Sequence, residues 1–244
     1  MNEVRYKRVL LKLSGESLKG DKSHGVDPKA LDYMAQEIKS ITQLGVELGI
    51  VVGGGNIWRG SEAELEGMDR ATADYAGMLA TVISAVALQE SLESKHKLDT
   101  RTMSSMNIQA VAEPYIRRRA IRHLEKKRVV LFAAGTGNPF VTTDTGAALR
   151  ALETDSEILL MAKNDVDGVY DKDPNNNLEA TKYDHITYLH AIEKRLRVMD
   201  STALSLCMEH SIPIIVFDLF KSGNLSKIVR GENIGTLVSE KDII

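Results

Sequence analysis

The chain has 244 residues, of which 43% are hydrophobic and 27% are charged, a balance that is typical of soluble globular proteins and argues against disorder. Its 31 basic and 34 acidic side chains give a net charge of −3, which argues against a broad nucleic-acid or membrane surface. The single cysteine, Cys207, excludes an internal disulfide and any cysteine-rich metal site. Its apolar neighbours indicate a buried helix face.

The length permits one large α/β domain or two small ones. Residues 1–8 contain no apolar signal core, and no apolar stretch approaches the length that spans a membrane. We therefore expect a cytoplasmic protein that binds neither membranes nor nucleic acid.

Five apolar runs predict β-strands, and most of them are continuous rather than alternating in polarity. Continuous runs are typical of strands that are buried on both faces of a parallel sheet. In chain order they cover residues 8–13, 48–52, 129–134, 157–161 and 213–217.

Helical patterns separate these runs. The first begins at Asp27, an N-cap residue that is followed by proline, and is expected to end near Gly45. Three further helices are expected: a long apolar one over residues 69–94, a basic one after Pro114, and one that includes residues 145–150.

Strands that alternate with helices predict an α/β fold, a three-layer α/β/α sandwich with a mainly parallel central sheet. We see no internal repeat and expect one domain over residues 1–244. The loose stretches 20–26 and 171–180 are typical of surface loops rather than domain linkers. Ligands in such folds bind beyond the carboxyl ends of the strands, where the informative loops of this sequence fall.

The most informative loop is Gly-Thr-Gly-Asn-Pro-Phe-Val-Thr-Thr-Asp, residues 135–144, between a strand and a helix. Its glycines leave backbone N–H groups exposed, and the helix that follows adds a positive dipole end. An anion can therefore be held here with little side-chain charge. The threonines and the asparagine suit a polar ligand. A generic strand-loop-helix turn is the plainer alternative.

The loop after the first strand contains Lys12 beside a Ser-Gly pair, and a lysine there can meet a polyphosphate as a point charge. The Walker spacing is absent, because an aspartate separates Gly20 from Lys22. A strand exit with a solvated lysine is the plainer alternative, so this loop is weak evidence by itself.

Three consecutive glycines, residues 53–55, follow the second strand. We expect them to bring backbone N–H groups close to an anion rather than to serve packing, and Arg59 can add a fork of donors to phosphate. The plainer alternative is a wide turn.

A fourth loop, residues 162–174, gathers carboxylates and a lysine at a strand end, with Tyr170 available to stack on a base. A solvated charged loop would look similar. The six histidines are scattered, no His-Glu-x-x-His motif exists, and zinc catalysis is not expected. Nothing in the sequence identifies metal ligands.

Four motifs occur in order: Lys-Leu-Ser-Gly-Glu, Gly-Gly-Gly-Asn, Gly-Thr-Gly-Asn-Pro-Phe, and Val-Asp-Gly-Val-Tyr with a later Asp-Pro. Over residues 6–239 the chain resembles the amino acid kinase family, and within it the bacterial branch that phosphorylates UMP. The resemblance implies a phosphotransferase that converts ATP and UMP to ADP and UDP with Mg²⁺, in pyrimidine nucleotide biosynthesis.

The resemblance also implies roles for particular residues. Phosphates of ATP would be held by Lys12, Leu13, Ser14, Gly15, Gly55 and Arg59. The adenosine part of ATP would be held by Asn164, Tyr170 and Asp173. UMP would be held by Gly54, Asp74, Thr136, Gly137, Asn138, Pro139, Phe140, Val141, Thr142 and Thr143. The N-terminal part would mainly bind UMP and form the oligomer, and the C-terminal part would mainly bind ATP.

Members of this branch form hexamers, are activated by GTP and are inhibited by UTP. Their activating segment corresponds to Gly20, Asp21, Lys22, Ser23, His24 and Gly25. The basic residues of 117–128 are expected to form a solvated helix face. The alternative is that Arg101, Lys126 or Arg128 binds an anionic effector at a subunit interface.

The acceptor phosphate has a second pKa of about 6, so no side chain has to remove a proton from it. Lys12 is expected to stabilise the transferring group, and Asp144 either orients lysines or Mg²⁺, or is a structural carboxylate at a helix N-terminus. Backbone groups and the side chains of Thr136, Asn138 and Thr143 are expected to match the polar edge of uracil. Two alternatives remain: another small-molecule kinase of the same fold, and a non-catalytic nucleotide-binding regulator.

Overall fold

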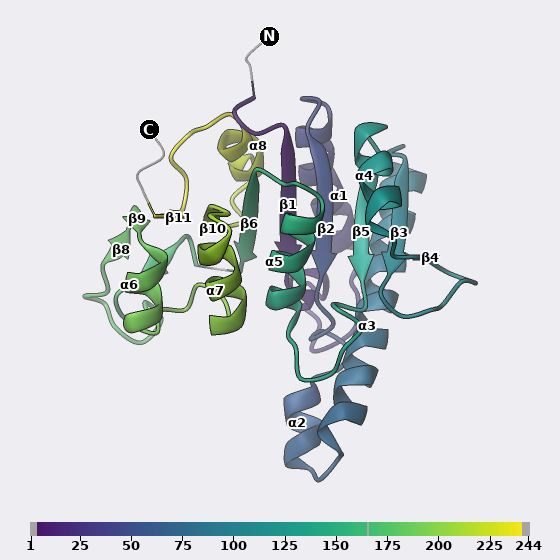
Figure 1. The fold of residues 1–244 in the computed structure, drawn as a ribbon, viewed down its shortest axis with the longest axis horizontal. Coiled ribbons are helices and arrows are strands. Elements are labelled where there is room, and N and C mark those ends of the chain that lie inside the picture. Colours follow the sequence, from purple (N-terminus) through teal and green to yellow (C-terminus); the bar gives the residue numbers. More distant parts are fainter. Residues whose placement is uncertain (1–3, 165, 241–244) are drawn as a thin grey trace.

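A computed structural model describes residues 4–164 and 166–240. Within those residues one nine-stranded sheet runs in the order β4-β3-β5-β2-β1-β6-β10-β11-β9 (Figure 1). Its strands are β1 (Arg8–Leu13), β2 (Glu47–Val52), β3 (Thr100–Ser104), β4 (Glu113–Pro114), β5 (Val129–Ala133), β6 (Ile158–Lys163), β9 (His185–Ile186), β10 (Ile214–Asp218) and β11 (Thr236–Val238). All described neighbours in this sheet pair in parallel except β10 and β11.

Helices cover both faces of this sheet (Figure 1). One face carries α1 (Pro28–Thr42), α3 (Arg70–Glu90) and α8 (Asn224–Val229). The other carries α4 (Arg117–Glu125), α5 (Thr143–Glu153), α6 (Tyr188–Glu193) and α7 (Ser201–Glu209). The expected three-layer α/β/α sandwich with a mainly parallel sheet is confirmed.

Smaller elements lie at the ends of this sandwich. They are the 3-10 turn η1 (Gly15–Leu18), α2 (Gly60–Leu65), the π-helical turn η2 (Ser91–Lys95) and the hairpin of β7 (Val169–Tyr170) with β8 (Lys182–Tyr183). Helix α2 and the first turns of α3 extend beyond the carboxyl ends of the strands, beside the loop between β5 and α5 (Figure 1).

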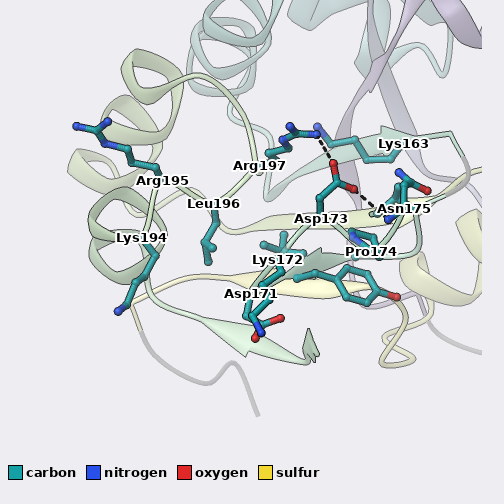
Figure 2. Close-up of a pocket in the computed structure, with 14 residues that line it drawn as sticks. Lys163, Asp171, Lys172, Asp173, Pro174, Asn175, Lys194, Arg195, Leu196 and Arg197 are labelled. Carbon is teal, nitrogen blue, oxygen red and sulfur yellow. Dashed lines mark hydrogen bonds and ion pairs between the residues drawn. The ribbon is translucent and has the colours of Figure 1, made fainter. Parts of the chain in front are cut away.

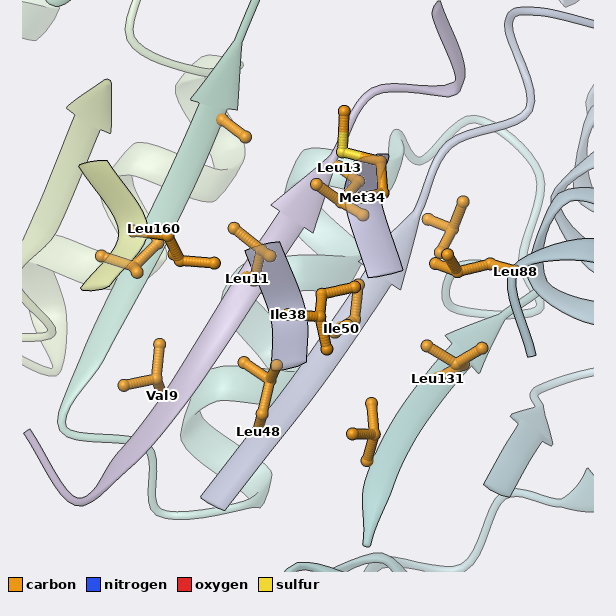
Figure 3. Packing of buried hydrophobic residues seen from close by; sticks show 14 of the residues in the cluster. Val9, Leu11, Leu13, Met34, Ile38, Leu48, Ile50, Leu88, Leu131 and Leu160 are labelled. Atoms are coloured by element: carbon orange, nitrogen blue, oxygen red, sulfur yellow. The ribbon is translucent and has the colours of Figure 1, made fainter. Parts of the chain in front are cut away.

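The central strands are held by apolar side chains alternating between the two faces. Figure 3 shows Leu11 and Ile50 packed against Met34 and Ile38 of α1, and all four are at most 1% exposed. Truncating one such side chain to alanine typically costs about 2–5 kcal/mol of stability. This packing fixes the ends of β1 and β2, from which two of the informative loops start.

The N-cap prediction for the first helix is confirmed, since the Asp27 side chain accepts a hydrogen bond from Lys29 N at 2.6 Å. That helix ends at Thr42, slightly before Gly45, which has a φ of 84°. The long apolar helix is α3 followed by the π-helical turn η2.

One expectation was wrong. The stretch Arg70–Lys95 has 26 residues and is, by length and composition, long and apolar enough to span a membrane. Its buried face, which includes Met78, Val82 and Leu88, packs on the sheet in the same cluster as Leu131. The stretch is therefore a core helix of the sandwich.

Candidate active site

Lys12 and Asp144 form an ion pair at the carboxyl end of the central strand. Lys12 lies in β1, and Asp144 lies in the first turn of α5, with 2.7 Å between Lys12 Nζ and Asp144 Oδ1. The two side chains are 14% and 19% exposed. Asp144 is placed by Thr142, the N-cap of α5, whose hydroxyl accepts the Asp144 N–H at 3.0 Å.

Lys163 lies on the same face of the sheet at the end of the neighbouring strand β6, where Lys12 pairs with Met161 in the register. Burial lowers the pKa of the Lys163 ammonium, repulsion from Lys12 lowers it further, and attraction to Asp144 opposes both. The site therefore holds two lysines whose charges both interact with the Asp144 carboxylate. Lys163 is the lysine at the strand end of the fourth loop, to which we assigned no role from the sequence.

A cavity of about 180 Å³ lies between the glycine loop, α3 and the β5–α5 loop, and we name it the Trp58 cavity after the tryptophan that lines it. Of the residues expected to hold UMP, it is lined by Gly54, Asp74, Thr136, Asn138, Val141 and Thr143. The other four expected residues, Gly137, Pro139, Phe140 and Thr142, are not among its lining residues.

Asp74 ties α3 to the β5–α5 loop. Its carboxylate accepts the Phe140 N–H at 2.8 Å and pairs with Arg70 at 3.0 Å. Phe140 has a φ of 67° and is 68% exposed, an uncommon backbone conformation for a bulky residue. The Asp74 carboxylate therefore helps to hold this part of the loop in place.

A second cavity, of about 350 Å³, lies beyond β6 and is named the Tyr170 cavity (Figure 2). Lys163, Tyr170 and Asp173 are among its lining residues. Asp173 accepts the Asn175 N–H at 3.0 Å and pairs with Arg197 at 3.0 Å, as Figure 2 shows. The Tyr170 hydroxyl donates a hydrogen bond to Asp167 at 2.6 Å, and this bond raises the pKa of Tyr170.

Asn164 is not among the lining residues of the Tyr170 cavity. Its side-chain oxygen accepts the Ser17 hydroxyl at 2.6 Å, which ties it to η1 beside the first loop. Residue 165, in the same loop, lies outside the described residues.

The sheet order places the ion pair between the two cavities. β2 and β5 lead to the Trp58 cavity, β6 leads to the Tyr170 cavity, and β1 lies between β2 and β6. Thr143, which precedes Asp144 in the chain, lines the first cavity, and Lys163, whose ammonium the Asp144 charge attracts, lines the second. Groups bound in the two cavities would thus face each other across Lys12 and Asp144.

Comparison with known proteins identifies the family to which a chain with this geometry belongs. A model of the amino acid kinase family matches residues 7–218. The chain belongs to the amino acid kinase family. A UMP kinase from Bacillus anthracis is 43% identical with a TM-score of 0.94, and the match covers 97% of each chain. A UMP kinase from Ureaplasma parvum is 40% identical with a TM-score of 0.90, over 97% of this chain and 100% of that one.

A more distant solved structure, the uridylate kinase from Archaeoglobus fulgidus, is 28% identical with a TM-score of 0.71, over 95% of this chain and 99% of that one. The structural likeness therefore spans almost the whole chain, and the family model spans all four informative loops.

In this amino acid kinase the first two loops cross at van der Waals distance. A Cβ on Gly15 would lie 2.9 Å from Gly55 N, and a Cβ on Gly54 would lie 2.7 Å from the Gly77 carbonyl of α3. Our expectation that the three glycines do not serve packing was therefore wrong. They allow the loop to fit between the first loop and α3, and Gly54 and Gly55 still line the Trp58 cavity.

Arg59 and the segment 20–25 lie beside the point where the first loop and the glycine loop cross. Arg59 forms an ion pair with Glu16. Burial raises the pKa of Glu16, but hydrogen bonds from Lys19 and Arg59 outweigh that effect and leave it lowered. The exposed segment is anchored at Gly25, which exchanges backbone and side-chain hydrogen bonds with Asn56 of the glycine loop.

The described residues contain no group of three or more His, Cys, Asp and Glu side chains that could hold a metal ion. Mg²⁺ is commonly bound by one or two carboxylates together with substrate phosphates. The partly exposed Asp144 carboxylate between the cavities fits such a partial site.

Two further residues at the site were missed in the sequence. Asp200, the N-cap of α7, accepts hydrogen bonds from the hydroxyls of Thr142 and Thr145, and so joins the N-termini of α5 and α7. Ser105 donates a hydrogen bond to the Gly135 carbonyl at 2.8 Å. Asp200 carries the sequence signal of an N-cap, whereas Ser105 carries none.

Proposed function

We propose that the chain is a UMP kinase, which transfers the γ-phosphoryl group of ATP to UMP and yields ADP and UDP. The observation that carries the proposal is the Lys12–Asp144 ion pair between two cavities at the carboxyl ends of parallel strands. The names of the two bacterial relatives at 40% and 43% identity support UMP as the acceptor.

In this proposal UMP occupies the Trp58 cavity and ATP occupies the Tyr170 cavity. The residues that line the first come from positions 54–143 and those that line the second from positions 163–197. This division supports one domain whose N-terminal part mainly binds UMP and whose C-terminal part mainly binds ATP. The glycine loop, with Lys12 to Gly15, Gly55 and Arg59, would meet the phosphates of ATP.

Catalysis follows from alignment and charge. The UMP phosphate arrives ionised near neutral pH, since its second pKa is about 6, so no general base is required. Lys12 and Lys163 supply positive charge to the transferring group, and Asp144 holds the Lys12 ammonium at 2.7 Å. Mg²⁺, when bound, would neutralise charge on the ATP oxygens, with Asp144 as the carboxylate that fits it.

Selection of uracil is proposed for the polar groups of Thr136, Asn138 and Thr143, which line the Trp58 cavity. Uracil and cytosine differ in the donors and acceptors at N3 and C4. A site that matches one of them leaves buried polar groups unpaired with the other, which costs about 10⁴-fold in favourable cases.

Regulation and assembly belong to the same proposal. We propose a homohexamer, activated by GTP through the segment Gly20–Gly25 and inhibited by UTP. An exposed apolar stripe on α3, formed by Tyr75, Leu79, Ile83 and Val86, supports oligomer formation. The contacts of Gly25 with Asn56 give the activating segment a direct link to the glycine loop. The alternative effector contacts remain Arg101, Lys126 and Arg128, and Arg101 and Arg128 are both paired with Asp99.

The cellular role that fits this activity is pyrimidine nucleotide biosynthesis in the cytoplasm. The test is release of ADP from ATP and Mg²⁺ with a panel of UMP, CMP, acetylglutamate, aspartate and carbamate. We expect release with UMP and little with CMP. Release with a carboxylate or carbamate acceptor would support another kinase of the family, and no release with any acceptor would support a non-catalytic nucleotide-binding regulator.

A further inference from the structure

The β5–α5 loop starts with two residues in the left-handed region. Ala134 has a φ of 60° and Gly135 a φ of 51°. Glycine adopts this region freely, but alanine does so at a cost of roughly 1–2 kcal/mol. A left-handed conformation at a residue such as Ala134 persists only where neighbouring groups stabilise it. The question is which groups do so, since this turn aims the rest of the loop at the Trp58 cavity.

The turn is held from both sides by side chains of other elements. On the α3 side, the Thr81 hydroxyl accepts the Ala134 N–H at 2.7 Å. On the α5 side, the Gly135 carbonyl accepts hydrogen bonds from the Ser105 hydroxyl at 2.8 Å and from Arg150 Nη2 at 3.3 Å. Arg150 Nη2 also donates to the Ser105 hydroxyl at 2.7 Å. Arg150, Ser105 and Gly135 thus form a closed triangle.

Arg150 is a buried cation with a defined orientation. It is 4% exposed, forms an ion pair with Glu153, and its Cζ lies 3.6 Å from the ring centroid of Tyr115. The Tyr115 hydroxyl donates a hydrogen bond to Glu153 at 2.5 Å. The Nε of Arg150 has no hydrogen-bond partner among the described residues.

A stability role explains this arrangement poorly. Replacing a buried ion pair by apolar residues of similar volume is often neutral or stabilising. The guanidinium also leaves one buried donor unsatisfied, which is unfavourable. The arrangement instead fixes an orientation. The Tyr115 ring and the Glu153 carboxylate hold the planar guanidinium so that it donates to the Gly135 carbonyl.

That carbonyl determines where the next donor points. A trans peptide is planar, so its C=O and the following N–H point in opposite directions. With the Gly135 carbonyl turned toward Arg150, the Thr136 N–H points away from it and has no acceptor among the described residues. Gly135 and Thr136 both line the Trp58 cavity. The N–H is therefore available to a ligand there.

We propose that Arg150 is a positioning residue for the acceptor: with Ser105 it fixes the Gly135 carbonyl and so presents the Thr136 N–H to the phosphorylated substrate. Arg150 touches no substrate itself. The proposal rests on the kinase function proposed above, in which UMP occupies the Trp58 cavity.

The test compares variants at the two ends of the Arg150 support. Ser105→Ala removes one corner of the triangle at little cost to folding, and Arg150→Met removes the cation. Arg150→Lys keeps the charge but loses the fork, and Tyr115→Phe, the matched control, loses the hydroxyl bond to Glu153 while keeping the ring. Each variant is assayed for KM of UMP, KM of ATP, kcat and melting temperature. Binding of UMP is titrated through the fluorescence of Trp58, the single tryptophan, which lines the cavity.

We expect Ser105→Ala to raise the KM for UMP by about three- to tenfold, the effect of one lost hydrogen bond, with the KM for ATP unchanged. Arg150→Met is expected to exceed this effect, and Arg150→Lys to restore part of it. Tyr115→Phe is expected to lower the melting temperature without changing the KM for UMP.

Two results would overturn the inference. If the KM for UMP follows the melting temperature in all variants, Tyr115→Phe included, the network is structural only. If Ser105→Ala leaves UMP binding and its KM unchanged, the Gly135 carbonyl does not position the acceptor, whatever Arg150→Met does to folding. Failure of the proposed function is seen separately, because wild-type protein would then release no ADP with UMP, and the inference would fall with it.

Discussion

Replacing Lys12 by alanine removes the ammonium that lies between the two cavities, 2.7 Å from Asp144. A unit charge that develops about 4 Å from an ammonium gains roughly 4 kcal/mol at an effective dielectric constant of about 20. Each 1.4 kcal/mol corresponds to about a factor of ten in rate, so we expect Lys12→Ala to lower kcat by about 10²–10³. The KM for UMP is expected to change little, because the charge acts mainly in the transition state.

The assay is steady-state release of ADP at saturating ATP and Mg²⁺, with UMP varied so that kcat and KM are obtained separately. Lys7→Ala is the matched control, since this exposed lysine precedes the other end of the same strand. Lys12→Ala also leaves Asp144 as an unpaired charge beside the phosphates. The double variant with Asp144→Asn removes that unpaired charge and so measures its part in the loss of kcat.

A Lys12→Ala variant with near wild-type kcat would remove Lys12 from the mechanism. A large rise in the KM for UMP at constant kcat would also refute the reasoning, because it would assign Lys12 to ground-state binding.

Three further predictions concern other parts of the site and the core. The pKa of Lys163 is lowered, so its ammonium is lost at lower pH than that of an ordinary lysine; we expect kcat to fall on the alkaline side, and Asp144→Asn to move this fall to lower pH because the Asp144 charge raises the pKa. An unchanged pH profile in Asp144→Asn would contradict this. Asp74→Ala removes the acceptor of the Phe140 N–H, and we expect the KM for UMP to rise about tenfold or more while the KM for ATP stays constant; equal rises in both would instead indicate a general loss of structure. Burial raises the pKa of the Cys207 thiol to about 12, so thiol reagents should label the folded protein slowly and the urea-unfolded protein fast; rapid labelling of the folded protein would contradict the buried position.

The strands that were predicted and those that were missed differ in composition. β1, β2, β5, β6 and β10 are continuous apolar runs, so their burial is visible in the sequence. β3 reads Thr-Arg-Thr-Met-Ser and gives no such signal. Its buried Thr102 is satisfied by Gln89 at 2.7 Å, a partner that the sequence does not reveal. β4, β7, β8 and β9 have two residues each, too few for any periodicity.

The candidate site divides in a similar way. The loops and Lys12 were predictable, because strand ends converge on one edge of a parallel sheet and carry recognisable motifs. The contacts that hold the loops were not. Thr142 meets Asp200 across 58 positions of the chain, and Arg150 meets Gly135 across 15, and both contacts depend on how the helices pack. Lys163 gains its lowered pKa only from being buried beside Lys12.

The shared cap of α5 and α7 changes how an anion is held at this end of the sheet. Asp144 lies in the first turn of α5, and Asp200 accepts hydrogen bonds from two hydroxyls at the same helix end. Two carboxylates therefore already offset the positive end of the helix dipole. The dipole therefore leaves less attraction for a phosphate, and more of that attraction must come from the two lysines and the other donors of the site. Because these charges are partly open to solvent, dissolved ions compete with the nucleotide. The affinity of the site for the nucleotide should therefore fall as ionic strength rises.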